Sequence, residues 1–321
     1  MPELTAQRYS RIRGTGSAQP AHVVTNDDLT RTLDTSDEWI TTRTGIRERR
    51  IAQDETLVDL AADAAQRALD DAGIDGADID LLIVATMTGE RSPSTAARVA
   101  GRLGVRKAMS YDLSAACAGF TMALAAADQA IRAGDAERAV VIGAERMSDF
   151  MDWSDRSTAI LMADGAGAAV LEASAERGVF PAVHGTEPSL ADAIRIERPD
   201  ERFTMQGASV LRWTMTNLPR IAQDALDRAG MRAERLAGFV PHQANSRIIA
   251  AVGDAIGVAP ERTSYDVATS GNTSAASVPI ALDKLRRGAL ADGGPVLLMG
   301  FGGGFSYAAQ VVEVPALQAP A

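Results

Sequence analysis

The sequence of 321 residues predicts a layered α/β fold made of two similar halves. Segments with helical periodicity alternate with apolar runs that are too short to form helices, as in folds where helices cover a sheet. Several motifs also recur at one fixed spacing, which is typical of an internal duplication. With 46% apolar and 23% charged residues, the chain has enough apolar surface to bury a large core.

Four segments predict helices because their apolar residues recur at steps of three and four. They are 56–71, 118–133, 211–229 and 245–256, followed by the helix-ending glycines Gly73, Gly134, Gly230 and Gly257. The predicted strands are 81–85, 108–113, 139–143, 167–171, 238–240 and 296–299. The segment 186–202 is polar and acidic and contains two prolines, so we expect a surface excursion there.

The duplication is visible as a shift of 157 positions. Residues 68–73 recur at 225–230, and the same shift places 140–143 on 297–300 and 114–117 on 271–274. Matches in register predict two copies of one α/β unit, which we place at residues 1–172 and 173–321. A site is expected where the copies face each other.

Composition excludes several classes of protein. The net charge of −10 argues against nonspecific nucleic-acid binding. A single cysteine excludes an intrachain disulfide, and no Cys/His cluster indicates a metal site. Residues 1–13 lack the apolar core of a signal peptide, and no apolar run approaches the ~20 residues needed to cross a bilayer. We therefore expect a cytoplasmic protein without membrane contact.

The lone cysteine, Cys117, lies where a predicted strand gives way to a helix. The unpaired N–H groups at a helix N-terminus favour a thiolate, the reactive form of cysteine. The alternative from this stretch alone is a small buried apolar residue, since free cysteine is among the most buried types.

The second half offers matching turns. His242 directly follows a predicted strand, Asn272 lies in a turn rich in small residues, and the glycines of 300–305 allow close backbone approach. Cys, His and Asn on comparable turns of a duplicated fold can converge at one point. Taken separately, Asn272 can equally be an ordinary helix cap, and the glycines can equally form a tight turn. No Gly-Lys-Ser/Thr follows the glycines, so a phosphate-binding loop of the Walker type is excluded.

From residue 12 to residue 312 the chain resembles β-ketoacyl-acyl-carrier-protein synthase III, a condensing enzyme of the thiolase fold. The nearest likeness is to actinobacterial versions. The motifs that carry the resemblance are 34–40, 42–49, 112–120, 164–168, 241–245, 271–279 and 300–305. It implies a duplicated, five-layered α/β/α/β/α sandwich with pseudo-twofold symmetry. It also implies a homodimer built through the first half.

The resemblance assigns chemistry to the three residues. Cys117 is the nucleophile that accepts an acyl group from an acyl-CoA primer, and His242 and Asn272 complete the triad. The backbone N–H groups of Cys117 and Gly303 stabilise the tetrahedral oxyanion. A malonyl thioester, on acyl carrier protein, then loses CO₂ and condenses to a 3-oxoacyl product. His242 and Asn272 stabilise the enolate formed in that step, and no metal, flavin or nicotinamide cofactor is implied.

Further residues are assigned to the ligand by the same resemblance. Trp39 and Arg156 hold the adenine of coenzyme A between an indole face and a guanidinium plane. Arg43, part of a local basic cluster, lies near the phosphates, and Asn245 lies along the pantetheine tunnel. From the residues alone, the basic cluster can instead be a solvated face. Arg156 can instead form a surface ion pair with Asp155.

The acyl pocket departs from the family pattern. Ser92 stands where acetyl-using members carry a bulky aromatic that caps the pocket across the dimer interface, and Met162 stands where Phe is common. Smaller and more adaptable side chains predict a primer larger than acetyl.

The carrier-docking residues depart as well. Arg212 and Arg247 keep basic positions of the family, but Asp254 replaces a lysine, which weakens steering of an acidic carrier. Residues 306–308 read Ser-Tyr-Ala rather than Thr-Trp-Gly. These departures leave open a less usual carrier protein or a free CoA acceptor, and fatty-acid initiation or polyketide and secondary-metabolite priming.

Two other functions remain possible at this point. A relative with the same triad transfers the acyl group to a hydroxyl or amine without forming a carbon–carbon bond. An inactive partner subunit of a condensing heterodimer is disfavoured, because Cys117, His242 and Asn272 are all intact.

Overall fold

The computed structural model describes residues 7–89, 92–197 and 201–317, which form two main sheets. The first sheet has the order β1 (Tyr9–Ala18), β7 (Asp164–Ser174), β6 (Arg138–Arg146), β4 (Leu81–Ala85) and β5 (Met109–Leu113). The second has the order β8 (Val183–Gly185), β13 (Tyr307–Val314), β12 (Gly294–Phe301) and β11 (Gly238–Pro241).

The two sheets repeat one topology. In each, the first three strands pair antiparallel and the third pairs parallel with the fourth. In the place of β5, the second sheet has an isolated parallel bridge between Phe239 and Thr263. The predicted duplication is therefore confirmed. The predicted boundary after residue 172 falls within the last residues of β7 and stays a prediction.

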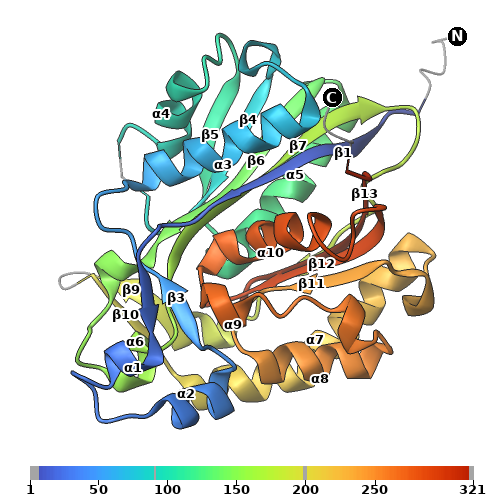
Figure 1. The fold of residues 1–321 in the computed structure, drawn as a ribbon. Helices are drawn as coiled ribbons and strands as arrows, with labels where there is room; N and C mark the ends of the chain where they lie inside the picture. Colours follow the sequence, from blue (N-terminus) through green and yellow to red (C-terminus); the bar gives the residue numbers. More distant parts are fainter. Residues whose placement is uncertain (1–6, 90–91, 198–200, 318–321) are drawn as a thin grey trace, which may run out of the picture.

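Helices form three layers around the sheets (Figure 1). Helices α5 (Gly119–Ala133) and α10 (Ser277–Arg286) lie between the sheets. Helices α3 (Leu57–Ala72) and α4 (Thr95–Arg102) cover the outer face of the first sheet. Helices α7 (Gly207–Ala229) and α8 (Ser246–Ile256) cover the outer face of the second. Each helical layer has its own apolar cluster, so the predicted five-layered α/β fold is confirmed.

The helix ends follow the sequence signals. Thr56 caps α3, because its hydroxyl accepts from the Asp59 N–H while the Asp59 carboxylate accepts from the Thr56 N–H. The four glycines predicted to end helices all adopt the left-handed conformation: they are Gly73, Gly134, Gly230 and Gly257. Helix α7 begins at Gly207, four residues before the predicted start at 211.

Shorter elements line the side of the molecule that holds α8. They are β2 (Val23–Thr25), α1 (Asn26–Leu29), α2 (Asp37–Thr44), β3 (Glu48–Arg50), α6 (Arg156–Ala159), β9 (Ile194–Glu197), β10 (Arg202–Met205) and α9 (Val267–Ser270). Strand β2 pairs with β3, and β9 pairs with β10. Among the described residues, no helix is long and apolar enough to cross a membrane.

The described part of the segment 186–202, which leaves out residues 198–200, lies mostly at the surface as predicted, but it also forms a strand and contributes to an apolar cluster. The segment contains β9, and Ile194 packs in an apolar cluster with the buried Phe203 of β10. In β9, isoleucine alternates with charged residues, which is the period of a half-buried strand. Four residues are too few for this pattern to stand out in a polar segment.

Contact between the halves depends on residues without side chains. A Cβ added at Gly167 of β7 would lie 2.6 Å from the Ile280 nitrogen and 2.7 Å from the Pro279 carbonyl carbon of α10. We expect Gly167→Ala to lower the free energy of unfolding by about 1–3 kcal/mol, because α10 must move off the sheet. Urea denaturation measures the change.

Gly101→Ala is the matched control, since no atom lies within 4 Å of a Cβ added at Gly101 in α4. This change should stabilise the protein by up to about 1 kcal/mol. Equal stabilities of the two variants would contradict the account of helix–sheet contact.

Candidate active site

Two similar turns bring the halves together. Cys117 lies in the 3₁₀ turn η2 (Ala116–Ala118), which leads into α5, and Ser274 opens the turn η7 (Ser274–Ala276), which leads into α10. Both turns use a left-handed residue, with φ of 46° at Ala116 and 48° at Ser274. The Cys117 Sγ lies 3.5 Å from the Ser274 Oγ, 157 positions further along the chain. The nucleophile candidate is thus at the junction of the two copies.

His242 follows β11 and is 3% exposed. Its Nδ1 lies 2.7 Å from the Ser277 Oγ, which also accepts the Gln243 N–H. We assign the Ser277 hydroxyl as the donor to Nδ1, which leaves the imidazole proton on Nε2. Burial lowers the pKa of His242 to about 3, so the ring is neutral near pH 7.

Asn272 is held by its backbone and its side chain. Its N–H donates to the Leu161 carbonyl and its carbonyl accepts from the Ala163 N–H, both at 2.9 Å. The Oδ1 accepts from the Ser274 N–H at 2.9 Å. Because the amide oxygen is engaged, the amide N–H₂ is the group that can donate to a ligand.

The three residues line one narrow cavity with a volume of about 50 Å³. Its walls are mostly apolar: Met87, Ala116, Met162, Ile194, Phe203, Met205, Val210, Trp213, Thr214, Ala244, Ile248, Phe301, Gly302 and Phe305. The structure therefore brings Cys117, His242, Asn272 and Met162 together around one apolar cavity.

Backbone N–H groups surround the sulfur. A Cβ at Gly302 would lie 2.6 Å from the Cys117 Cβ and 2.9 Å from its Sγ, so only glycine permits this approach. The backbone N–H groups of Cys117 and of Gly303, the next residue, both lower the pKa of the thiol, as donors close to the sulfur do. These are the two donors predicted for the oxyanion.

The expectation of a thiolate is wrong, because Cys117 is fully buried. Burial raises the pKa of Cys117 to about 12, and the nearby Glu145 carboxylate also raises it. The polar groups of Ser274, Cys117 and Gly303 beside the sulfur lower its pKa but do not outweigh burial. Position at a helix N-terminus alone does not decide the charge of a fully buried sulfur.

The residues predicted to bind coenzyme A also lie together. The guanidinium carbons of Arg43 and Arg156 lie 4.7 Å and 4.8 Å from the centre of the Trp39 ring. Asn245 caps α8 and donates its side-chain N–H to the Arg43 carbonyl at 2.9 Å. Arg156 touches the indole directly, so it must move aside before a base can stack on that face.

Other predicted residues lie apart from this cavity. Ser92 is exposed and is not among the lining residues, so its predicted role at the pocket across a dimer stays a prediction. Arg212 of α7 and Arg247 and Asp254 of α8 are exposed. Their role in docking a carrier stays a prediction as well.

Sequence reasoning missed several residues of the site. Ile194, Phe203, Met205 and Trp213 line the cavity, and Glu145 lies buried behind Ser274. Ser274 could have been found, because the shift of 157 positions places it on Cys117. Glu145 has no signal in the sequence beyond its place at the end of a predicted strand.

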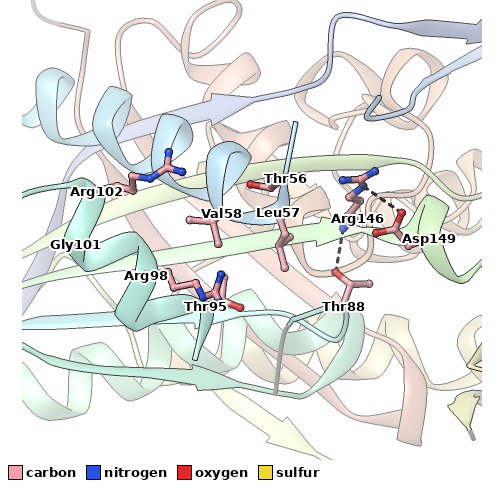
Figure 2. A pocket seen from close by; sticks show the side chains of 10 residues that line it. All are labelled: Thr56, Leu57, Val58, Thr88, Thr95, Arg98, Gly101, Arg102, Arg146 and Asp149. Atoms are coloured by element: carbon pink, nitrogen blue, oxygen red, sulfur yellow. Dashed lines mark hydrogen bonds and ion pairs between the residues drawn. The ribbon is translucent and has the colours of Figure 1, made fainter. Parts of the chain in front are cut away.

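A second, open groove lies on the first half, away from the cysteine cavity (Figure 2). It is lined by Thr56, Leu57, Val58, Thr88, Thr95, Arg98, Gly101, Arg102, Arg146 and Asp149. Arg102 pairs with Asp59 at 2.8 Å and Arg146 pairs with Asp149 at 3.2 Å. Within the described residues, no cluster of three or more His, Cys, Asp or Glu could hold a metal ion.

Comparison with known proteins gives one family. The family model for 3-oxoacyl-[acyl-carrier-protein] synthase III matches residues 111–188, and its C-terminal model matches residues 226–314. A β-ketoacyl-[acyl-carrier-protein] synthase III of Streptomyces coelicolor is 52% identical over 95% of this chain and 99% of its own. One of Streptomyces avermitilis is 53% identical with the same coverage.

Solved structures agree. The priming β-ketosynthase of the R1128 polyketide pathway superposes with a TM-score of 0.94 at 42% identity, covering 99% of this chain and 100% of its own. The synthase III of Pseudomonas aeruginosa gives 0.92 at 40% identity, covering 97% and 100%.

The duplicated sheets and the buried Cys–His–Asn arrangement define a condensing enzyme of the thiolase fold. Within that class, the chain belongs to the β-ketoacyl-[acyl-carrier-protein] synthase III family of acyltransferases.

The close approach of Gly302 predicts a loss of cysteine reactivity on substitution. In Gly302→Ala, the added methyl group pushes against the sulfur and the Cys117 nitrogen, 2.8 Å away. We expect alkylation of Cys117 by iodoacetamide, followed by intact mass, to slow at least about tenfold. Gly101→Ala should react like the wild type, and an unchanged rate in Gly302→Ala would show that the approach is not tight.

Proposed function

We propose that the protein primes chain synthesis by two reactions at Cys117. An acyl group passes from an acyl-CoA to the sulfur, and a malonyl thioester then loses CO₂ and condenses with it to give a 3-oxoacyl product. The observation that carries this proposal is the convergence of Cys117, His242 and Asn272 in one apolar cavity. Family membership supports it.

In the first reaction, the sulfur attacks the thioester carbonyl and coenzyme A leaves as its thiol. The carbonyl oxygen gains negative charge in the tetrahedral intermediate. The N–H groups of Cys117 and Gly303, which lower the pKa of the thiol, are suited to stabilise that oxygen. Fixed backbone donors need no rearrangement as charge develops, which makes them effective in a dry site.

In the second reaction, loss of CO₂ leaves an enolate that attacks the acyl-enzyme. Two hydrogen-bond donors are suited to stabilise the enolate oxygen: the His242 Nε2–H and the Asn272 amide N–H₂. His242 is suited to donate as a neutral imidazole, because burial lowers its pKa to about 3. Ser277 and the Ser274 N–H keep the two donors oriented.

Coenzyme A serves as a substrate in this scheme, and no metal or redox cofactor takes part. The contacts among Trp39, Arg43, Arg156 and Asn245 support an entrance for its nucleotide at α2 and α8. The malonyl group arrives on an acyl carrier protein, with the exposed Arg212 and Arg247 as docking residues.

The primer is larger than acetyl, by this proposal. The apolar cavity and the adaptable Met162 support this, and Ser92 of a second copy leaves the end of the pocket uncapped. This requires a homodimer, because Ser92 does not line the cavity of its own chain. Both fatty-acid initiation and polyketide priming use such a reaction, and a cytoplasmic location suits either.

The first test uses intact mass spectrometry with a mixed acyl-CoA panel. Wild-type protein should gain one acyl group, and Cys117→Ala should gain none, because the alanine offers no nucleophile. A malonyl-carrier chase should then give a product longer by a C₂ unit, with release of CO₂. A product without the added carbons would instead indicate transfer to a hydroxyl or amine. An acyl adduct on Cys117→Ala would show that Cys117 is not the nucleophile.

The second test concerns primer size. Ser92→Phe should shift the ratio of kcat/KM toward acetyl-CoA by at least about tenfold, because an aromatic ring fills the end of the pocket. Ser154→Phe, another exposed serine, is the control for adding a ring to the surface. Strong preference of the wild type for acetyl-CoA would contradict the proposed primer class.

A further inference from the structure

Glu145 is a buried carboxylate that the reaction scheme above does not use. It lies near the end of β6 and is 0% exposed. Within the described residues it has no ion pair, and its partners are neutral donors. They are the Thr86 and Thr88 hydroxyls, the Met87, Thr88 and Ala275 N–H groups, and the Ser274 hydroxyl. A carboxylate without a cation in the core is costly, so its placement calls for an explanation.

One side of Glu145 leads to the nucleophile. The Cys117 S–H donates to the Ser274 Oγ at 3.5 Å, and the Ser274 hydroxyl donates to the Glu145 Oε1 at 3.0 Å. The Met87 Sδ lies 3.3 Å from the same hydroxyl, but a carboxylate is the stronger acceptor. The three groups form a continuous chain of hydrogen bonds that runs away from the sulfur.

The other side of Glu145 leads toward solvent. The Thr88 hydroxyl donates to the Glu145 Oε2 at 2.7 Å and accepts from the Arg146 N–H at 3.0 Å. Thr88 lines the open groove, where Figure 2 shows this bond to Arg146. Glu145 therefore lies between a closed apolar cavity and a solvent-filled groove, with one hydroxyl on each side.

The proposed function requires protons to move at the sulfur. In acylation, the Cys117 S–H bond breaks and the departing CoA sulfur takes up a proton. In condensation, the malonyl carboxylate leaves as CO₂, the carbon–sulfur bond to the acyl group breaks, and the Cys117 thiolate must regain a proton. Each turnover thus consumes one proton from solvent at a site whose walls are mostly apolar.

We propose that Ser274 and Glu145 form a proton relay for Cys117. During attack, Ser274 accepts the thiol proton and passes its own to the Glu145 carboxylate, which leaves a thiolate and a carboxylic acid. The reverse transfer restores the thiol when the product is released. The proton demand rests on the proposed function, but the hydrogen-bond chain exists in the free protein.

The charge balance agrees with this transfer. The pair carries one negative charge before and after the step, so no charge is added to the core. Because burial raises the pKa of Cys117 to about 12 and that of Glu145 only to about 7, the proton moves uphill and leaves the thiol as the sulfur attacks. A pKa of about 7 lets Glu145 both accept and release a proton near neutral pH. Cys117 is the titratable group that faces Glu145. The other contacts of Glu145 are neutral and come from residues 86–88, which follow β4, and from η7.

The test measures cysteine reactivity without any acyl substrate. Iodoacetamide alkylation of Cys117 is followed by intact mass between pH 6 and pH 9 in wild type, Glu145→Gln and Ser274→Ala. For the wild type we expect a rate that rises as Glu145 ionises and then levels off. Both variants should react at least about tenfold more slowly at pH 7.5 and lose the plateau, since only the thiol's own ionisation remains.

Thr86→Val is the matched control, because it removes another bond to Glu145, at 3.2 Å, but leaves the relay intact. It should keep the wild-type rate and pH profile. If Glu145 acts only as a nearby negative charge, Glu145→Gln lowers the pKa of Cys117 and speeds alkylation, which overturns the proposal. If Glu145→Gln does not fold, Ser274→Ala decides, and a wild-type profile there also overturns the relay.

The two proposals fail separately. Absence of an acyl adduct on the wild type would reject the proposed function, whereas the alkylation profile would still judge the relay. Normal acylation together with unchanged alkylation in both folded variants would reject the relay alone.

Discussion

The structure depends on the contact between two turns, one from each half of a duplicated chain. Turns η2 and η7 each begin a helix of the central layer, and they meet at Cys117 and Ser274. This contact fixes where the sulfur lies, because helices α5 and α10 and both sheets converge on it. A reactive residue therefore lies beside the apolar cluster between the sheets, which includes Phe120 and Ala275, and not on a surface loop.

Glycine residues make the contact between the two turns possible. Gly143 of β6 lies against η7, where an added Cβ would come within 2.3 Å of the Ala275 carbonyl oxygen. Gly302 lies in the same way against Cys117. These glycines let backbone groups approach the sulfur in place of side chains, and the proposed oxyanion donors are therefore N–H groups that cannot rotate away.

The sequence predicted the layered fold, the duplication and the helix ends, because glycine caps and apolar periods are local signals. The strand 81–85 coincides with β4, and the shift of 157 positions coincides with the separation of Cys117 and Ser274. The charge of Cys117 could not be predicted, since burial by distant segments outweighs the helix terminus. Ile194, Phe203 and Glu145 were missed for the same reason: their role comes from tertiary contacts, and short polar context conceals them.

The stacking of Arg156 on Trp39 affects how the proposed coenzyme A entrance distinguishes its two thioester substrates. Under the proposed function, a nucleotide must displace a cation that already occupies the indole face, so it gains only the difference between two stacking energies. A pantetheine arm delivered by a carrier protein has no adenine, so it can pass while Arg156 stays stacked on Trp39. In that proposal, the Arg156–Trp39 contact opens for the donor thioester and stays closed around the acceptor.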